Sequence, residues 1–281
     1  MILSGAARLA GVMGWPVKHS LSPRLHGYWL VEDGIDGAYV PLAVAPERLG
    51  EALRGLPALG FQGCNVTIPH KEAAFALMDE VTPLARRLGA VNTVAVDGEG
   101  RLLGSNTDGF GFIENLRANA PDWRADAGPA VILGAGGAAA AVVAALQDAG
   151  CPEVRLLNRT RARAETLAGQ LGGAVTVHDW ADRAAVLAGA GLLANTTALG
   201  MTGQDPLEID LAALPMAAVV TDIVYNPLMT GLLADARGRG NTIVDGIGML
   251  LHQARPGFSH WYGAEPTVSL GLRDHVLAGL G

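Results

Sequence analysis

The sequence predicts an α/β protein made of two domains, and three observations lead to that prediction. Short apolar runs typical of strands alternate with amphipathic helical stretches over most of the chain. A polar segment with two prolines, residues 120–129, interrupts the alternation and has the composition of an interdomain connection. The chain has 281 residues, of which 50% are hydrophobic and 17% charged, so it can bury two cores and is not a disordered chain.

The first series of elements precedes the polar segment. Strands are expected at residues 9–13, 38–41 and 63–68, and helices at residues 22–32 and 46–56. This repeated order of strand, helix and strand implies parallel pairing with crossover helices. Two further strands, at residues 91–96 and 102–105, flank Asp97-Gly98-Glu99-Gly100, a sequence typical of a hairpin turn.

The second series follows the polar segment. Strands are expected at residues 130–133, 154–157, 175–178, 192–195, 219–223 and 242–244. The chain after Gly246 has helical patterns, and periodicity alone does not assign this last part to either domain.

Composition and charge exclude several classes of protein. The net charge of −7 argues against a nucleic-acid partner, because phosphate binding needs clustered Lys and Arg. The longest apolar stretch, residues 130–146, contains three glycines and fits strand, turn and helix better than a membrane span. Two cysteines and the lack of a basic leader favour the cytoplasm. The seven histidines show no ligand spacing with Cys or acids, so no metal is implied.

A cofactor signal lies at Gly134-Ala135-Gly136-Gly137-Ala138-Ala139, between an expected strand and an expected helix. This is the pattern Gly-x-Gly-x-x-Ala of a dinucleotide-binding turn. The first glycine permits the tight turn, the second lets backbone amides approach a pyrophosphate, and the small last residue lets helix and strand pack closely. The alternative is an ordinary strand-to-helix loop, but the strand and helix on either side favour a dinucleotide in a Rossmann domain.

The residues after the next strand indicate which dinucleotide binds. An NAD enzyme usually has an acid there for the ribose 2′-hydroxyl, but this chain has Asn158-Arg159-Thr160-Arg161-Ala162-Arg163, with no acid before Glu165. Asn158, Arg159, Thr160 and Arg163 offer donors suited to a 2′-phosphate. The alternative is a solvated basic helix start, which is unfavourable because cations at a helix N-terminus need a neutralising anion. NADP is therefore the predicted cofactor.

A candidate substrate site begins at Cys64-Asn65-Val66-Thr67-Ile68-Pro69-His70-Lys71. Strand alternation places Asn65 and Thr67 on one face and turns Val66 and Ile68 toward the core. Lys71 is expected in the first turn after the strand, where a helix N-terminus can lower its pKa for proton transfer. The alternative is a solvated lysine at a strand end, and the neighbouring polar side chains argue against it.

Three other polar clusters can join this site. They are Ser105-Asn106-Thr107-Asp108-Gly109, Ala90-Val91-Asn92-Thr93 and His19-Ser20-Leu21-Ser22-Pro23. Each has a structural alternative: Thr107 or Asp108 can cap a helix, and so can Ser22 before Pro23, whereas Asn92 simply needs a partner in an apolar strand. Together they describe a site rich in neutral donors with one Lys and one Asp.

These and other segments make the sequence resemble the shikimate dehydrogenase family along nearly its whole length. The matching segments, in order, are Gly14-Trp15-Pro16-Val17-Lys18-His19-Ser20-Leu21-Ser22-Pro23, Asn65-Val66-Thr67-Ile68-Pro69-His70-Lys71, Gly89-Ala90-Val91-Asn92-Thr93, Asn106-Thr107-Asp108-Gly109, Gly134-Ala135-Gly136-Gly137-Ala138, Asn158-Arg159-Thr160, Asp222-Ile223-Val224-Tyr225-Asn226-Pro227-Leu228 and Asp245-Gly246-Ile247-Gly248-Met249-Leu250. So many matches in the right order make chance resemblance implausible.

The resemblance implies a role for each site residue. Ser20 and Ser22 would hold a substrate carboxylate, and Lys71, helped by Asp108, would transfer the proton. Ring hydroxyls would be bound by Asn65, Thr67, Asn92, Asp108 and Gln253, and the nicotinamide side would be lined by Ile223, Tyr225, Gly246 and Met249. Gln253 implies a discontinuous first domain, residues 1–118 and 246–281, with residues 119–245 as the NADP-binding domain and the active site in the interdomain cleft.

The implied activity is reversible reduction of 3-dehydroshikimate to shikimate by NADPH. Two alternatives stay open: a quinate/shikimate dehydrogenase with broader substrate or NAD use, and a non-catalytic ligand-binding regulator. A monomer and a homodimer both fit. The sequence departs from the family at Pro256, which should end or kink a helix that continues in relatives, and in the loop 195–201, which matches only loosely.

Overall fold

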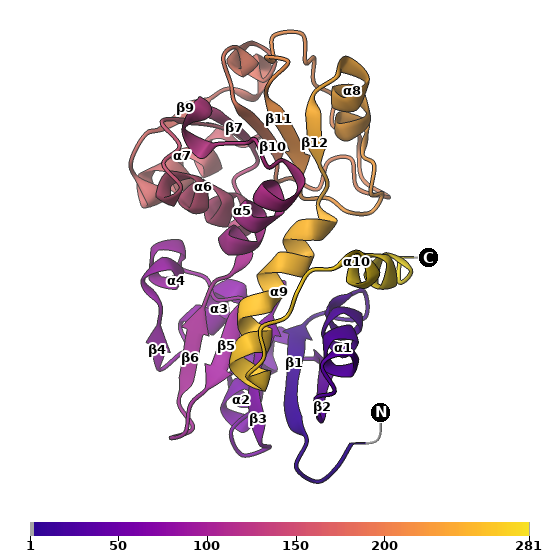
Figure 1. Ribbon diagram of the computed structural model, residues 1–281. Coiled ribbons are helices and arrows are strands. Elements are labelled where there is room, and N and C mark those ends of the chain that lie inside the picture. Colours follow the sequence, from indigo (N-terminus) through magenta and orange to yellow (C-terminus); the bar gives the residue numbers. More distant parts are fainter. Residues whose placement is uncertain (1–2, 281) are drawn as a thin grey trace. The chain divides into compact units, whose positions relative to one another are not determined.

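The computed structural model describes residues 3–280, and the terminal residues 1, 2 and 281 that the sequence assigns to the first domain lie outside that range. The chain forms two compact units (Figure 1). One contains the residues up to Thr107 and those from Gln253 onward, and the other spans Asp108–His252. The boundaries between the two compact units therefore fall after residues 107 and 252, whereas the domain boundaries predicted from the sequence fall after residues 118 and 245.

The first unit contains a mixed six-stranded sheet in the order β2-β1-β3-β5-β6-β4. Its elements are β1 (Arg8–Gly14), α1 (Ser22–Glu32), β2 (Gly37–Ala43), the 3₁₀ helix η1 (Pro46–Arg48), α2 (Leu49–Gly55), β3 (Phe61–Val66), α3 (Lys71–Phe75), β4 (Glu80–Val81), α4 (Pro83–Leu88), β5 (Thr93–Val96), β6 (Leu102–Ser105) and α10 (Leu270–Leu277). Strand β1 pairs in parallel with β2 and β3, as the crossover pattern predicts. Strand β5 pairs antiparallel with β3 and β6.

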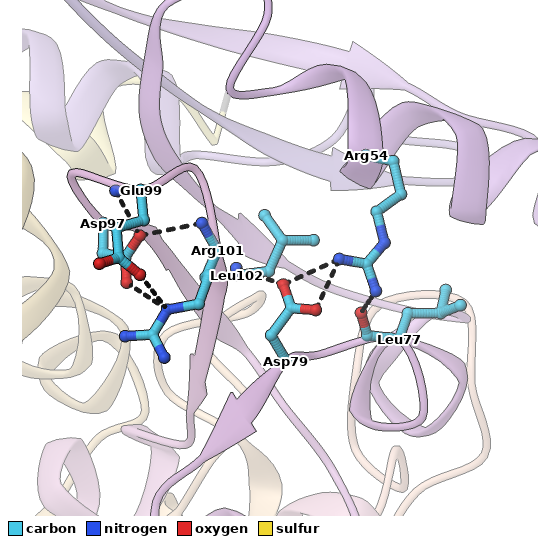
Figure 2. A network of polar contacts seen from close by, with 7 residues as sticks. All are labelled: Arg54, Leu77, Asp79, Asp97, Glu99, Arg101 and Leu102. Carbon is cyan, nitrogen blue, oxygen red and sulfur yellow. Dashed lines mark hydrogen bonds and ion pairs between the residues drawn. The ribbon is translucent and has the colours of Figure 1, made fainter.

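The hairpin between β5 and β6 forms at the predicted turn. The Asp97 carboxylate accepts hydrogen bonds of 2.9 Å from the backbone amides of Glu99 and Arg101, which closes the turn (Figure 2). Nearby, Asp79 accepts a bond from the amide of Leu102 at 2.8 Å and forms an ion pair with Arg54. These exposed contacts fix the loop before β4 against β6.

One side of the first unit is filled by an aromatic cluster. Trp29, Phe258 and Trp261 are at most 1% exposed, and the imidazole of His26 lies among them. The Tyr39 ring stacks on His26 with a centroid separation of 3.9 Å. Burial lowers the pKa of His26 to about 3, so its imidazole is neutral inside the folded protein.

The second unit contains an all-parallel six-stranded sheet in the order β12-β11-β10-β7-β8-β9. Its elements are α5 (Asp108–Asn119), η2 (Ala125–Ala127), β7 (Ala130–Leu133), α6 (Gly137–Asp148), β8 (Val154–Leu157), α7 (Arg161–Leu171), β9 (Val175–His178), η3 (Trp180–Asp182), η4 (Ala185–Leu187), β10 (Leu192–Asn195), β11 (Val219–Asp222), α8 (Gly231–Arg239) and β12 (Thr242–Val244). Counted from β7, this is the strand order 3-2-1-4-5-6 of a doubly wound sheet. The order reverses between β7 and β10, which is where such sheets bind ligands.

Close packing explains why α5 belongs to the second unit. A Cβ on Gly109 would lie 2.7 Å from the carbonyl oxygen of Ala141 in α6, so the first turn of α5 lies directly on that helix. At the other end of α5, Asn115 donates a 2.7 Å hydrogen bond to the carbonyl of Asp245 and contacts Gly248.

Helix α9 (Ile247–Tyr262) contains Pro256, so of the two expected effects of this proline, ending or kinking the helix, the first does not occur. Proline removes one backbone hydrogen bond and costs about 3 kcal/mol in a helix interior. The residues around it offset this cost, because Ala254 and Phe258 are fully buried and Trp261 is 1% exposed. No helix of residues 3–280 is long and apolar enough to cross a membrane.

Candidate active site

Asn65 occupies the end of β3 and has hydrogen-bond partners at both ends of its side chain. Its Oδ1 accepts a 2.6 Å hydrogen bond from the Tyr39 hydroxyl. Its Nδ2 donates to the backbone carbonyl of Asn92 and to Thr93 Oγ1, each at 3.1 Å. Asn65 and Thr93 are cross-strand partners in the antiparallel β3–β5 pair, so the sheet register brings them together. The amide of Asn65 is therefore buried and held in one position.

Asn92 precedes β5 and links this strand to the residues after β6. Its Oδ1 accepts a 2.9 Å hydrogen bond from the backbone amide of Thr107. Its Nδ2 lies 3.1 Å from Thr107 Oγ1 and 3.5 Å from Gln253 Oε1. The structure thus brings together three of the predicted substrate-binding amides, those of Asn65, Asn92 and Gln253, from distant parts of the chain.

Lys71 is the first residue of α3, the position that the sequence predicts for it. Its carbonyl accepts a 2.9 Å bond from the amide of Val91, so its main chain lies beside the strand that carries Asn92. Asp108 begins α5 and follows Thr107 directly in the chain. Asp108 is the first residue of the second compact unit. The pairing of its side chain with that of Lys71 stays a prediction.

The structure removes one alternative and corrects one detail of the predicted site. Ser22 does not cap α1: Leu21 is at the N-cap position without a side-chain bond, and Ser22 is the first helical residue. Instead the backbone amide of Ser22 donates to Ser20 Oγ at 3.3 Å. Ile68 is 76% exposed instead of buried in the core, because β3 ends at Val66 and the alternation stops there.

Thr67 lies just beyond the end of β3 and is half-buried. Its amide donates to the carbonyl of Met13 at 2.9 Å, and its own carbonyl accepts from the amide of His70 at 2.9 Å. The His70 side chain is buried, with Nε2 2.7 Å from the carbonyl of Val44. These contacts hold the turn that leads from Asn65 to Lys71.

The glycine turn after β7 has the geometry of a dinucleotide-binding turn. Gly134 has a φ of 115°, and a Cβ there would lie 2.6 Å from Thr196 Oγ1, so the fold itself requires glycine at this position. At Gly136 and Gly137 a Cβ would meet no atom within 4 Å. Packing within the protein therefore does not explain these two glycines, and the predicted close approach of a pyrophosphate would explain them.

The residues around Gly134–Gly137 fit the remainder of that interpretation. Gly136 is the N-cap of α6, so the first amides of this helix are presented beside Ala135 and Ala138 at the turn. Ala139 is fully buried, as expected for close packing of helix on strand.

The basic residues after β8 divide into two kinds. Arg161 forms 2.8 Å ion pairs with Glu165 and Asp179. Arg159 and Arg163 are exposed, and across residues 3–280 their side chains have no ion-pair or hydrogen-bond partner. Thr160, the N-cap of α7, makes no side-chain capping bond, and Asn158 Nδ2 donates to its carbonyl at 2.9 Å. The arrangement leaves two guanidinium groups and a hydroxyl available for a phosphate.

The residues predicted for the nicotinamide side follow β11 and β12. A Cβ on Gly246 would lie 2.4 Å from the carbonyl oxygen of Ile223, so these two segments are in direct backbone contact. Tyr225 and Met249 are half-buried. Burial raises the pKa of the Tyr225 phenol.

A buried carboxylate that the site prediction missed lies beneath these segments. Asp222 accepts hydrogen bonds from Asn195 Nδ2 and the amide of Val224, both at 3.0 Å, and from Thr230 Oγ1 at 2.8 Å. Asn195 in turn accepts from the Thr197 hydroxyl at 2.7 Å. Burial raises the pKa of Asp222 to about 6. Its contacts join the loops that follow β10 and β11, and in the sequence Asp222 was recognisable only as part of a family motif.

Two family models match the chain. The shikimate dehydrogenase substrate-binding domain matches residues 12–94, and the shikimate/quinate 5-dehydrogenase model matches residues 122–200. The NADP-dependent shikimate dehydrogenase of Paramagnetospirillum magneticum is 64% identical over 98% of this chain and 100% of its own length. The chain belongs to the shikimate dehydrogenase family.

Solved structures of this family share the fold of the chain. The shikimate 5-dehydrogenase of Thermus thermophilus, in complex with NADP(H) and shikimate, has a TM-score of 0.86 and 38% identity, and the match covers 97% of this chain and 99% of that one. The quinate dehydrogenase of Corynebacterium glutamicum, in complex with NAD, has a TM-score of 0.90 and 32% identity, with the same coverage. Fold similarity within the shikimate dehydrogenase family therefore does not by itself decide between shikimate and quinate.

Proposed function

We propose that the protein catalyses the reversible, NADP-dependent reduction of 3-dehydroshikimate to shikimate. The observation that carries the proposal is the convergence of the amides of Asn65, Asn92 and Gln253 in one unit. Neutral amides bind the hydroxyl groups of a polyhydroxylated ring by donating and accepting hydrogen bonds. A relative that is 64% identical and acts as an NADP-dependent shikimate dehydrogenase supports the same choice.

The second unit would hold NADP through its backbone and its free cations. The pyrophosphate would lie at Gly134–Ala138, where Gly136 and Gly137 leave open space. The 2′-phosphate would be bound by Asn158, Arg159, Thr160 and Arg163, and the nicotinamide side would be formed by Ile223, Gly246 and Met249. When bound, NADPH supplies the hydride that reduces the ring ketone.

The residues of the first unit would bind the substrate and move the proton. Ser20 and Ser22 would hold the carboxylate, and Tyr225 is also proposed as a substrate-binding residue. As hydride reaches the carbonyl carbon, the oxygen gains negative charge, and Lys71 Nζ donates the proton that completes the alcohol. Asp108 would orient the Lys71 ammonium and accept a hydrogen bond from a ring hydroxyl.

The proposal also covers the cell compartment and the partners. The acidic net charge and unpaired cysteines are consistent with a cytoplasmic enzyme whose partner is a small molecule, not a nucleic acid. The predicted domain boundaries, residues 1–118 with 246–281 and residues 119–245, remain part of this proposal, as do both a monomer and a homodimer.

Steady-state kinetics tests the proposal. Turnover of shikimate and of quinate is measured by nicotinamide absorbance, each with NADP and with NAD. We expect the highest kcat/KM for shikimate with NADP. A higher kcat/KM for quinate or with NAD would favour the broader dehydrogenase, for which the quinate dehydrogenase fold provides a precedent. Absence of turnover with all four pairs would favour a ligand-binding regulator.

A further inference from the structure

Behind the candidate substrate amides lies a continuous chain of buried hydrogen bonds, entirely within the first unit. It includes two residues that the proposed function does not use, Tyr39 on β2 and Thr93 on β5, which are 7% and 5% exposed. Tyr39 bonds to Asn65 on one side, and Thr93 bonds to both Asn65 and Asn92 on the other.

The direction of these hydrogen bonds is set by two main-chain groups. The backbone carbonyl of Asn92 can only accept, so the end of the Asn65 amide that faces it must be Nδ2. The backbone N–H of Thr107 can only donate, so the end of the Asn92 side chain that faces it must be Oδ1. A carboxamide is nearly symmetric in shape, and these two contacts remove the ambiguity of both amides.

Thr93 transmits this direction from one amide to the other. Its single hydroxyl accepts from Asn65 Nδ2 at 3.1 Å and donates to Asn92 Oδ1 at 2.8 Å. A hydroxyl has one proton, so it can serve both partners only in this sense. Both hydrogens of the Asn65 amide are consequently used inside the protein, and Asn65 can offer a ring hydroxyl only the second lone pair of Oδ1.

Tyr39 completes the chain at the other end. Its hydroxyl donates to Asn65 Oδ1 at 2.6 Å. The ring is held by stacking on His26, with an interplanar angle of 3°. Burial raises the pKa of Tyr39 well above its usual value, so the phenol keeps its proton and remains a donor. Tyr39 thus holds the Oδ1 end of the candidate hydroxyl-binding residue Asn65 from strand β2.

We propose that Tyr39 and Thr93 are positioning residues: the main chain sets the ends of the Asn65 and Asn92 amides, and these two hydroxyls hold the amides in place for recognition of the ring hydroxyls. This inference rests on the proposed function. It assigns neither residue a direct contact with substrate. It makes the position of the substrate-site amides depend on two side chains buried behind them.

The test uses Tyr39→Phe and Thr93→Val, which remove the hydroxyls and keep the shapes. We expect kcat/KM for shikimate to fall about 10-fold for each, the factor that corresponds to about 1.4 kcal/mol, through a higher KM for shikimate. The KM for NADP should not change. Thr93→Ser keeps the hydroxyl that Thr93→Val removes, so its kcat/KM for shikimate should stay close to that of the wild type.

A matched control separates positioning from loss of packing. Tyr262→Phe removes another buried phenol hydroxyl of the same unit, one that donates to the carbonyl of Ala38 at 2.9 Å. It should leave the KM for shikimate unchanged. A ring-deoxy shikimate that lacks the hydroxyl facing these amides should lose the penalty of Thr93→Val, a result that a general structural defect would not give.

Several outcomes would overturn the inference. These are an unchanged KM for shikimate in folded Tyr39→Phe and Thr93→Val, an equal effect in Tyr262→Phe, or an equal loss in Thr93→Ser. If one variant does not fold, the other still decides. Calorimetric titration with shikimate keeps the test separate from the proposed function: a wild-type protein that binds shikimate without turnover refutes the activity, and the variants' Kd still tests the positioning.

Discussion

The two units prepare their candidate sites in different ways. In the first, amides such as Asn65 and Asn92 are buried and held by side-chain and main-chain groups, in bonds of 2.6–3.1 Å. In the second, the candidate cofactor site consists of a backbone turn at Gly134–Gly137 and of exposed cations, Arg159 and Arg163. One site depends on an internal network, and the other on backbone shape and available charge.

The difference corresponds to what each site has to bind. Neutral hydroxyl groups differ from one another only in position and in hydrogen-bond direction, so they are distinguished by donors and acceptors whose orientation is fixed. A phosphate is bound by charge and by backbone amides, which tolerate movement of individual side chains. Substitutions in the first unit should therefore change substrate use or stability, and those in the second should change cofactor use.

The largest expected effect is at Lys71. Lys71→Ala should lower kcat by roughly 10²–10⁴-fold, because it removes the group that donates the proton. The dissociation constant for NADPH, measured by fluorescence titration, should not change. The chain has one other lysine, and Lys18→Ala is the matched control with near-normal turnover. Near-normal turnover of Lys71→Ala would remove this residue from the mechanism.

The next effect is on the stability of the first unit at low pH. Burial lowers the pKa of His26 from 6.5 to about 3. Between these two pH values the unfolded chain binds a proton at His26 and the folded protein does not. Stability should therefore be lost as the pH falls from about 7 to about 3, by up to about 5 kcal/mol from this residue. Urea unfolding across this range measures the loss. His26→Phe should reduce the slope, and His260→Gln at an exposed position should leave it unchanged.

A smaller effect sharpens the assignment of cofactor choice to the second unit. Arg159→Ala and Arg163→Ala should each raise the KM for NADP about 10- to 100-fold, since each removes a charge-assisted hydrogen bond to phosphate. The KM for NAD should stay nearly constant, and so should kcat. Arg161→Ala is the control, because Glu165 and Asp179 already engage that guanidinium. An equal rise for Arg161→Ala would show that general positive charge, not these two residues, selects NADP.

The smallest expected effect on stability distinguishes two glycines of one turn. Gly136→Ala should change the free energy of unfolding by no more than about 0.5 kcal/mol, because its Cβ would meet open space, yet it should weaken NADP binding. Gly134→Ala should destabilise the protein by about 1–3 kcal/mol, because of its positive φ and the nearby Thr196. Thermal unfolding without cofactor separates the two. An equal loss of unfolding free energy in the two variants would mean that the backbone of the whole turn tolerates no side chain.

Much of the fold could be predicted from the sequence because buried parallel strands are short apolar runs between turn residues. Strands β7, β8, β9, β10 and β12 match their predicted bounds, and so does α1. The short elements β4 and α4 were missed, because two and six residues are too few to show a period. Helix α9 continued through Pro256 because tertiary packing outweighed a local rule.

The candidate site was predictable only in part. Polar residues at strand ends, such as Asn65, Asn92 and Lys71, could be selected from their unusual setting. The roles of Tyr39 and Thr93 could not, because they arise from the β3–β5 register and from a contact between β2 and β3. Asp222 was recognisable only as part of a family motif, and nothing in the sequence shows which loops it joins.

The backbone carbonyl of Asn92 and the backbone amide of Thr107 set the direction of the buried hydrogen bonds, and no substitution can exchange a carbonyl for an amide. Evolution can delete parts of this arrangement but cannot reverse it. Specificity for other ring substrates should therefore arise from substitutions at the margin of the site, at positions such as Ser20 and Thr67, while the buried hydrogen-bonded residues stay unchanged. Directed evolution toward other cyclic acids has the best prospects when its libraries are concentrated there.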